Sequence, residues 1–361
     1  MRPPARPHAA VTAIILLALG AVACSPGGVG GSPDSTDPAS GSAGASEPVE
    51  LRLGYFPNLT HATALAGIKE GFFEAALPDN VTLTTTPFNA GPEAIEAIFS
   101  GGLDASFIGP NPAINAFSRS KGEAIRIVSG ATSGGAYLVV KPEITSAAQL
   151  KGKTLATPQL GNTQDVALRA WLNEQGLATD VNEGGDVSIV PQANAQTLDT
   201  FKAGDIDGAW VPEPWATRLV QEAGGKVLVD ERDLWPDGEY VTTHLIVTTE
   251  FLSAHPDVVK ALLTGVVEAN DFVNADPTAA QAVVNEGIKD VTEKALPEPV
   301  LAAAWPNLTF TVDPIASSLT TSAAAATELG LLEATDLDGI YDLTLLNEVL
   351  KAAGKPEIPQ P

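Results

Sequence analysis

The segment Gly102-Leu-Asp-Ala-Ser-Phe-Ile-Gly-Pro-Asn-Pro112 recurs in pattern as Gly204-Asp-Ile-Asp-Gly-Ala-Trp-Val-Pro-Glu-Pro214. In both copies a glycine turn precedes a short apolar run, and a Pro-x-Pro turn follows that run. A polar loop and a short helical run come before each copy, and the loop begins at Asn89 in one case and at Asn194 in the other. This order predicts two α/β units, each with a buried strand that ends in a polar loop.

A second matched pair lies upstream of each copy. Residues 51–57 lead into a helix that ends near Gly71, and residues 154–158 lead into a helix that ends near Gly176. Ligands of open α/β sheets bind outside the carboxyl ends of the strands, and these loops occupy that position in both units. The sequence therefore predicts an α/β protein of two lobes that face each other across a ligand cleft.

The chain is predicted to cross between the two lobes twice. We expect the first lobe to comprise residues 48–144 plus 241–300, the second lobe residues 145–240, and residues 301–361 to form helices that wrap the first lobe and a loose tail. Crossings near residues 140–146 and 240–244 would then form a hinge. Closure of the lobes around a ligand by hinge bending is the expected motion.

The beginning of the chain predicts export. Residues 1–8 carry two arginines and no acid, and residues 9–23 are an apolar run too short to span a bilayer. The run ends Ala21-Val-Ala-Cys24, which resembles the lipobox of bacterial lipoproteins, so we expect a signal peptide over residues 1–23 and lipidation of Cys24. An ordinary cleaved signal with an incidental cysteine is the alternative. Residues 24–47, rich in Gly, Ser and Pro, should form a flexible tether.

Composition narrows the class of partner and of chemistry. The formal charge of −24 disfavours nucleic-acid binding, because the phosphate backbone would be repelled. A single cysteine excludes internal disulfides and makes a zinc–thiolate site implausible, and the few histidines are scattered. Nucleophile-elbow, zinc-protease and dinucleotide-binding motifs are missing from the sequence. We therefore expect no metal, no cofactor and no enzymatic activity.

Candidate ligand contacts in the first lobe are polar or small residues in the strand-end loops. Helix N-termini in such loops present free N–H groups, which favours an anionic ligand. Helix capping or tight turns would explain the same residues without any ligand. The candidates are Asn58, Thr60, His61, Gly109, Asn111, and, from a predicted bend between two β-rich runs, Thr132, Ser133 and Gly134.

The second lobe offers an equivalent set. Asn162, Thr163 and Gln164 stand in it where Asn58 and its neighbours stand in the first lobe. Further along, the chain offers Trp210, Glu213 and Trp215. The two tryptophans could line the cleft and the glutamate could contact the ligand. Alternatively, Trp210 packs in the core and Glu213 is solvated. Thr243, at the second crossing, could belong to the hinge, the core or the site.

Several of these motifs also resemble a known family. They are Pro57 to Ala62, Ile108 to Pro110, Thr132 to Gly135, Pro158 to Asp165 and Trp210 to Trp215. Over about residues 49–335 the chain resembles the substrate-binding proteins of ABC importers for sulfonate, nitrate, taurine and bicarbonate, and most of all the aliphatic-sulfonate branch. The resemblance implies a two-lobed type II periplasmic-binding fold, a small anionic ligand, and a membrane permease with its ATPase subunits as partners. Together with the lipobox, it implies a protein tethered by a lipid to the extracytoplasmic face of a bacterial cell membrane.

The chemistry of the candidates agrees with an anionic ligand except at one residue. Neutral donors and helix dipoles can hold a sulfonate, but a buried Glu213 carboxylate beside it would be costly unless it faced solvent or paired with a cationic part of the ligand. An ammonium group, as in taurine, would supply that cation. Nitrate, bicarbonate or a thiamine-pyrimidine precursor stacked on a tryptophan are alternative ligands. The remote alternative is an enzyme resembling a pyrimidine-precursor synthase.

Overall fold

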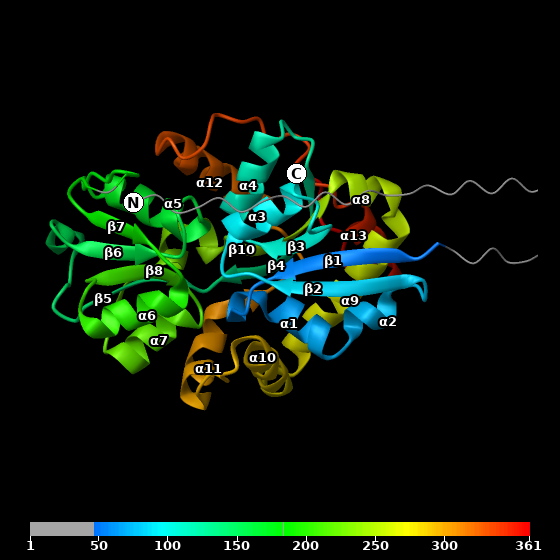
Figure 1. Cartoon of the computed structure of the whole chain (residues 1–361), viewed down its shortest axis with the longest axis horizontal. Coiled ribbons are helices and arrows are strands. Elements are labelled where there is room, and N and C mark those ends of the chain that lie inside the picture. Colours follow the sequence, from blue (N-terminus) through cyan, green and yellow to red (C-terminus); the bar gives the residue numbers. More distant parts are fainter. Residues whose placement is uncertain (1–46, 183) are drawn as a thin grey trace, which may run out of the picture. The chain divides into compact units, whose positions relative to one another are not determined.

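The computed structural model describes residues 47–361 apart from residue 183. The expected signal peptide of residues 1–23, Cys24 and all but the last residue of the expected tether lie outside the described residues. The described chain contains two separate sheets, each covered by helices on both faces (Figure 1). The α/β architecture with two lobes, predicted from the repeat, is confirmed.

The first sheet has six strands in the order β11-β4-β10-β3-β1-β2. Its strands are β1 (Val49–Tyr55), β2 (Val81–Pro87), β3 (Ala105–Ile108), β4 (Ile125–Gly134), β10 (Val241–Thr248) and β11 (Leu308–Phe310). β1 pairs in parallel with β2 and β3, whereas β10 runs antiparallel between β3 and β4. The carboxyl ends of β1, β2 and β3 therefore lie at one edge of the sheet, where their loops can meet.

Helices cover both faces of this sheet and enclose two apolar cores. One core packs the sheet against α1 (Ala62–Lys69), α2 (Phe72–Ala76), α9 (Pro256–Ala275), α10 (Pro277–Thr292) and α13 (Thr344–Ala352). The other packs it against α3 (Gly91–Phe99), α4 (Pro110–Arg119) and α12 (Ala316–Glu328). Shorter elements of this lobe are η1 (Leu59–His61), α8 (Thr249–Ala254), α11 (Glu298–Ala304) and η5 (Trp305–Asn307).

The second sheet has five strands in the order β7-β6-β8-β5-β9. These are β5 (Ala136–Val140), β6 (Thr154–Thr157), β7 (Ser188–Pro191), β8 (Gly208–Pro212) and β9 (Lys226–Asp230). Its helices are η2 (Ala147–Leu150), α5 (Thr163–Glu174), α6 (Asn194–Ala203), α7 (Trp215–Ala223), η3 (Glu231–Leu234) and η4 (Pro236–Gly238). β6 pairs in parallel with β7 and β8, so the loops after these three strands again share one edge.

The first crossing between the lobes lies earlier than predicted. β5 pairs with β8 and β9, so residues 136–144 belong to the second lobe, and the expected boundary at residue 144 and hinge at 140–146 are wrong. The chain passes from sheet to sheet at Gly134 and Gly135, both with positive φ, a conformation that glycine adopts without strain. Residues 125–140 are rich in β-forming residues on both sides of this crossing between the lobes, so the two glycines were its sequence signal.

Two further expectations need correction. A bend was predicted over residues 131–135, but residues 131–134 continue strand β4 and pair with β10 and β11. The end of the chain is not loose, because Asn347 holds Ile358 by two hydrogen bonds of 2.8 Å, from its Nδ2 to the carbonyl oxygen and from the backbone N–H to its Oδ1. Residues 301–361 do pack on the first lobe, but they also supply the edge strand β11.

Candidate ligand-binding site

The strand-end loops of the two lobes enclose a small cavity, called here the anion cavity. Its volume is about 20 Å³, enough for a water-sized group. Residues of the first lobe that line it are Phe56, Asn58, Thr60, His61, Asn89, Ala90, Gly109 and Thr242, and those of the second lobe are Pro158, Asn162, Thr163, Gln164, Asn194 and Pro212. Both halves of the internal repeat thus contribute to a single site.

Several helices begin at this cavity. Ala90, Gly109 and Asn162 are the N-cap residues of α3, α4 and α5, and Asn194 is the first residue of α6. Asn58 caps η1, which runs directly into α1. The N–H groups of a first helical turn have no partner within the helix, and the helix dipole adds partial positive charge there. Convergence of these ends on one cavity favours a bound anion.

Two polar atoms in the cavity wall have no hydrogen-bond partner. They are Thr163 Oγ1 and Asn194 Oδ1, on side chains that are only 6% and 8% exposed. Buried polar groups are rarely left unpaired, so each indicates a ligand or a water at this place. Gly109 lies against the same hydroxyl, because a Cβ at this position would stand 2.5 Å from Thr163 Oγ1.

His61 contributes an uncharged donor. Its Nδ1 accepts a hydrogen bond of 3.3 Å from the backbone N–H of Phe56, and the two rings pack with their centroids 4.4 Å apart. Burial lowers the pKa of His61 to about 3, so the ring is neutral at physiological pH. In a neutral ring with Nδ1 as acceptor, Nε2 carries the proton and can donate it to a ligand.

The lining residues include no lysine, arginine, aspartate or glutamate. The buried carboxylate of Asp165, in the first turn of α5, is neutralised within its own lobe. It accepts from Arg169 Nε at 3.1 Å, from Thr157 Oγ1 at 2.9 Å and from the N–H of Gly161 at 2.9 Å. The cavity can therefore hold an anion by neutral donors and helix dipoles, with no carboxylate in its wall.

The lobes contact each other around the cavity. Trp215 Nε1 donates to Asn58 Oδ1 at 2.8 Å, and Gln159 Nε2 donates to Glu93 Oε1 at 2.7 Å. A third bond joins Asn307 Nδ2 to Glu213 Oε1 at 2.7 Å. These three bonds between the lobes, together with the small volume of the cavity, indicate that the lobes are closed over it.

The predicted site residues divide into two groups. Those that line the cavity are Asn58, Thr60, His61, Gly109, Asn162, Thr163 and Gln164. Trp215 and Glu213 do not line it but join the lobes beside it. Glu213 also accepts from the hydroxyl and the N–H of Thr217, and its burial, the largest effect, raises its pKa.

The other predicted contacts do not line the anion cavity, and their contact with a ligand stays a prediction. Trp210 is fully buried in the second-lobe core and donates to Glu231 Oε2 at 2.7 Å. The Thr132 hydroxyl donates to the carbonyl oxygen of Thr60 at 2.7 Å, so it braces a site residue instead of reaching a ligand.

Ser133 and Gly134 are paired within the first sheet, where β4 continues through the predicted bend. Asn111 does not line the anion cavity, and its Nδ2 donates to the carbonyl oxygen of Ser322 at 3.3 Å. Thr242 lines the cavity in place of the predicted Thr243, because neighbouring residues of a strand point to opposite faces.

Asn89 and Asn194 line the cavity, but the sequence analysis missed them as ligand candidates. Each begins one copy of the repeated loop, and both line the same cavity. Their equivalent positions in the repeat were the available signal. Phe56, Ala90, Pro158 and Pro212 lie inside segments that the sequence analysis singled out, but they were not named as candidates because they carry no donor side chain.

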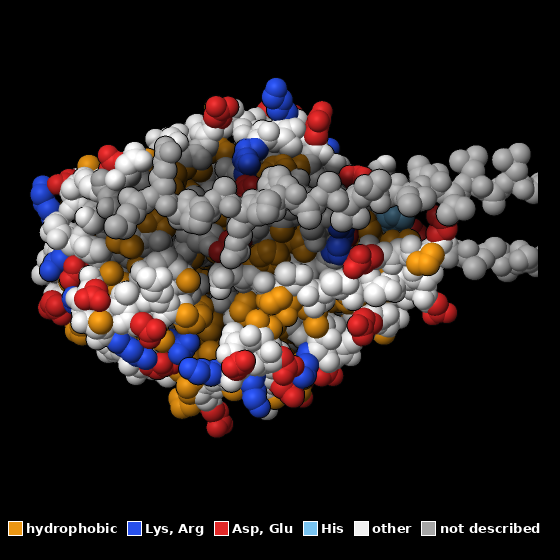
Figure 2. Space-filling view, in the orientation of Figure 1, with side chains coloured by type: hydrophobic (Ala, Val, Ile, Leu, Met, Phe, Trp, Pro, Cys, Tyr) orange, Lys and Arg blue, Asp and Glu red, His pale blue; other side chains and the backbone are white. Residues whose placement is uncertain are grey.

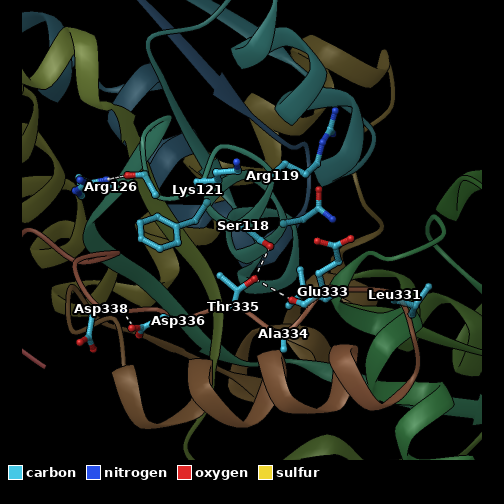
Figure 3. Close-up of a pocket in the computed structure, with 14 residues that line it drawn as sticks. Ser118, Arg119, Lys121, Arg126, Leu331, Glu333, Ala334, Thr335, Asp336 and Asp338 are labelled. Carbon is cyan, nitrogen blue, oxygen red and sulfur yellow. Dashed lines mark hydrogen bonds between the residues drawn. The ribbon is translucent and has the colours of Figure 1, made fainter.

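A larger hollow lies elsewhere on the first lobe and has a different character. It measures about 820 Å³ and lies between α4 and the segment 331–338 (Figure 3). Arg119, Lys121 and Arg126 line it together with Glu333, Asp336 and Asp338, so its walls carry both signs of charge. Arg126 already donates to the carbonyl oxygens of Gly122 and Ile125. The strand-end loops do not reach this hollow.

The surface and the helices add two observations. On the face shown in Figure 2, acidic side chains are spread among basic ones and do not gather into one patch. Within the described part of the chain, every helix is too short or too polar to cross a bilayer. In the same residues, no group of three or more His, Cys, Asp or Glu side chains is placed to hold a metal ion.

Comparisons with known proteins agree with this arrangement. The NMT1-like family profile matches residues 44–286. The taurine-binding periplasmic protein of Escherichia coli is 28% identical over 202 residues, which cover 56% of this chain and 61% of that protein. The family resemblance predicted from the sequence motifs is confirmed.

Solved structures share the fold. The alkanesulfonate-binding protein SsuA from Xanthomonas axonopodis pv. citri aligns with a TM-score of 0.67 and 20% identity, over 80% of this chain and 96% of that one. The periplasmic nitrate-binding protein NrtA from Synechocystis aligns with a TM-score of 0.70 and 17% identity, over 87% and 91%. The two-lobed fold of periplasmic binding proteins is therefore confirmed.

Proposed function

Because the chain belongs to the NMT1-like family, we propose that it is the substrate-binding component of an ABC importer and captures a small anion, an aliphatic sulfonate. One observation carries the proposal. Helix N-termini from both lobes, with the unpaired buried hydroxyl of Thr163, converge on a closed cavity that has no charged side chain in its wall. The names of the E. coli relative and of SsuA, which state binding of taurine and of alkanesulfonate, support the ligand class.

The proposed mechanism is capture by closure. A sulfonate presents three oxygens and one delocalised negative charge, so it can accept from several neutral donors at once. The first lobe offers the Nε2–H of His61 and the start of α4, and the second lobe offers Thr163 and the start of α5. A ligand that bonds both lobes stabilises the closed arrangement, which the permease would then receive.

Glu213 no longer argues for a zwitterionic ligand. Its carboxyl group is occupied by Thr217 and Asn307, so it neither opposes an anion nor needs an ammonium partner. Stacking of an aromatic precursor on Trp210 or Trp215 is not supported either. Trp210 is buried in the second-lobe core, and Trp215 does not line the anion cavity and packs against Arg218.

Nitrate or bicarbonate is the second candidate, and the cavity volume of about 20 Å³ favours it. Both anions are smaller than any organic sulfonate and would need less opening of the lobes. The same donors would serve them.

The proposed location follows from the export pattern. We propose that residues 1–23 are removed, that Cys24 is acylated, and that the protein acts at the extracytoplasmic face of the cell membrane beside a permease and its ATPase subunits. Metabolic labelling with a radioactive fatty acid tests the anchor. Label should appear on the protein in its native host and vanish in Cys24→Ser, and label retained by that variant would reject Cys24 as the site.

The ligand is tested by calorimetry and thermal shift on the purified protein with methanesulfonate, ethanesulfonate, taurine, nitrate, bicarbonate and an aminopyrimidine. A ligand at 100 times its dissociation constant adds about 2.7 kcal/mol to the free energy of unfolding. Thr163→Val should weaken anion binding at least about tenfold, since a hydrogen bond to a charged group is lost. Thr264→Val, in α9 and outside the cavity, is the matched control. Stabilisation by the aminopyrimidine alone would overturn the proposal.

A further inference from the structure

A second cavity adjoins the anion cavity and is called here the tail cavity. It measures about 170 Å³ and lies between the lobes. Helix α5 and residues 231–235 of the second lobe form one wall, and α12 with Asn111 of α4 forms the other. Thr163 lines both cavities, so the two spaces meet at this residue.

The tail cavity is mainly apolar. Val166, Ala167 and Trp171 of α5 face Ala325 of α12 across it, and Leu234, which is 44% exposed, lies at its rim. An apolar protein cavity of about 150 Å³ is known to bind benzene. By this measure the tail cavity has room for roughly six carbon atoms.

The charged groups of the tail cavity are acidic. Glu231 is only 2% exposed and accepts from Trp210 Nε1 at 2.7 Å, and its burial raises its pKa to about 7. The exposed Glu174 completes the acidic pair, and the lining residues include no lysine or arginine. A second anionic group would thus meet no counter-charge here, whereas an uncharged group needs none.

We infer that the tail cavity holds the uncharged, mainly apolar tail of an organic anion whose charged head lies in the anion cavity. This inference rests on the proposed function and narrows its substrate class to monoanions with a tail of up to about six carbons. Nitrate and bicarbonate have no group that could use this space. Because each lobe supplies one wall, burial of the tail also favours the closed arrangement.

The test is a chain-length series of linear sulfonates from methanesulfonate to octanesulfonate, measured by calorimetry on the full chain. Affinity should rise about fourfold for each methylene, the expected gain for a buried CH₂, and stop rising near six carbons. Butane-1,4-disulfonate should bind at least about tenfold more weakly than butanesulfonate, because its second charge would be buried unpaired.

Variants place the effect in the tail cavity. Ala325→Leu and Ala170→Leu, one in each wall, should abolish the gain with chain length and leave methanesulfonate affinity within about twofold. Ala324→Leu, on the exposed side of the same helix α12, is the matched control and should keep the gain. The melting temperature without ligand verifies that each variant folds. Ala325→Leu and Ala170→Leu lie in opposite walls and should give the same loss of the gain with chain length.

The outcomes separate this inference from the proposed function. If methanesulfonate binds but affinity does not rise along the series, the tail-cavity inference is overturned and the anion site is retained. The same holds if both filling variants keep the full gain in affinity with chain length. Binding of nitrate or bicarbonate without any sulfonate would overturn the tail cavity together with the sulfonate assignment.

Discussion

At the scale of single residues, the site depends on small features of shape and protonation. Gly109 leaves the space that the Thr163 hydroxyl occupies, and His61 offers a proton without a charge. Neither role is visible in the residue type alone, since glycine also suits a turn and histidine also suits a core. The role of each lining residue therefore depends on the residue that packs against it, Thr163 in the case of Gly109 and Phe56 in the case of His61.

Gly109→Ala should damage the site more than the fold. The added Cβ would stand 2.5 Å from Thr163 Oγ1, so either the hydroxyl or the start of α4 must move. We expect anion affinity to fall at least about tenfold and the free energy of unfolding to fall by about 1–3 kcal/mol, typical of an overpacked position. Calorimetry and urea denaturation measure the two effects. Gly287→Ala in α10 is the control, because its Cβ would meet Leu65 at an ordinary 3.4 Å.

The protonation of His61 predicts a specific pH dependence. Its pKa is about 3 in the folded state and near 6.5 when unfolded, so the unfolded chain binds the proton first as pH falls. His61 therefore lowers the free energy of unfolding between about pH 6.5 and 3, by up to about 1.4 kcal/mol per pH unit. Above about pH 6.5 it has no such effect, and ligand affinity should be flat to about pH 8.

Urea denaturation of wild type and His61→Gln at several pH values isolates this contribution. The difference between the two proteins should change with pH only below about pH 6.5. A difference that is constant down to about pH 4.5 would show that His61 is charged in the folded protein.

At the scale of elements, α5 illustrates how a helix can serve both the fold and the site. Its N-terminus faces the anion cavity, while Asp165 and Arg169 form a buried ion pair within its first turns. The Asp165 carboxylate reduces the positive potential at the helix start but is needed to neutralise the guanidinium. Stability and anion affinity should therefore respond in opposite directions when this carboxylate is removed.

Asp165→Asn tests that opposition. The variant leaves the Arg169 charge buried without its partner, and we expect the free energy of unfolding to fall by about 3–5 kcal/mol. Anion affinity of the folded fraction should rise, because the cavity gains net positive potential. Denaturation and calorimetry below the melting temperature measure both quantities. Asp199→Asn, exposed on α6, should change neither, and a loss of affinity in Asp165→Asn would contradict this account.

At the scale of the whole molecule, the contacts between lobes decide how readily the cleft closes. Only a few side-chain bonds join the lobes at the cleft, among them Trp215 to Asn58 and Asn307 to Glu213. The two chain crossings connect the same lobes, one of them through Gly134 and Gly135. A hinge at these glycines would let the second lobe move without disturbing either sheet.

Trp215→Phe should shift the molecule toward an open arrangement. The substitution removes the hydrogen bond to Asn58 and keeps most of the ring under Arg218. We expect the radius of gyration from small-angle X-ray scattering to be larger than in wild type without ligand, and affinity to fall by about five- to tenfold. The unfolding midpoint should change little. An unchanged radius with equal affinity would mean that this bond does not influence closure.

The amino-acid sequence by itself determined the two α/β units, the strand-end position of the candidate site and the neutral, donor-rich character of its loops. These features are local or periodic, since glycine turns, apolar strands and helix caps act over a few residues. The segments around Asn58 and Asn162 were found for that reason, and both reach the cavity.

The tertiary structure alone decided which polar residues line the anion cavity and which pack elsewhere. Trp210, Thr132 and Asn111 have the composition of a site, yet their partners Glu231, Thr60 and Ser322 lie far away in sequence. The crossing at Gly134 and Gly135 likewise depends on which sheet β5 joins, a choice between partners distant along the chain. Such pairings are set by packing between helices and strands that are distant along the chain, so a local sequence pattern cannot predict them.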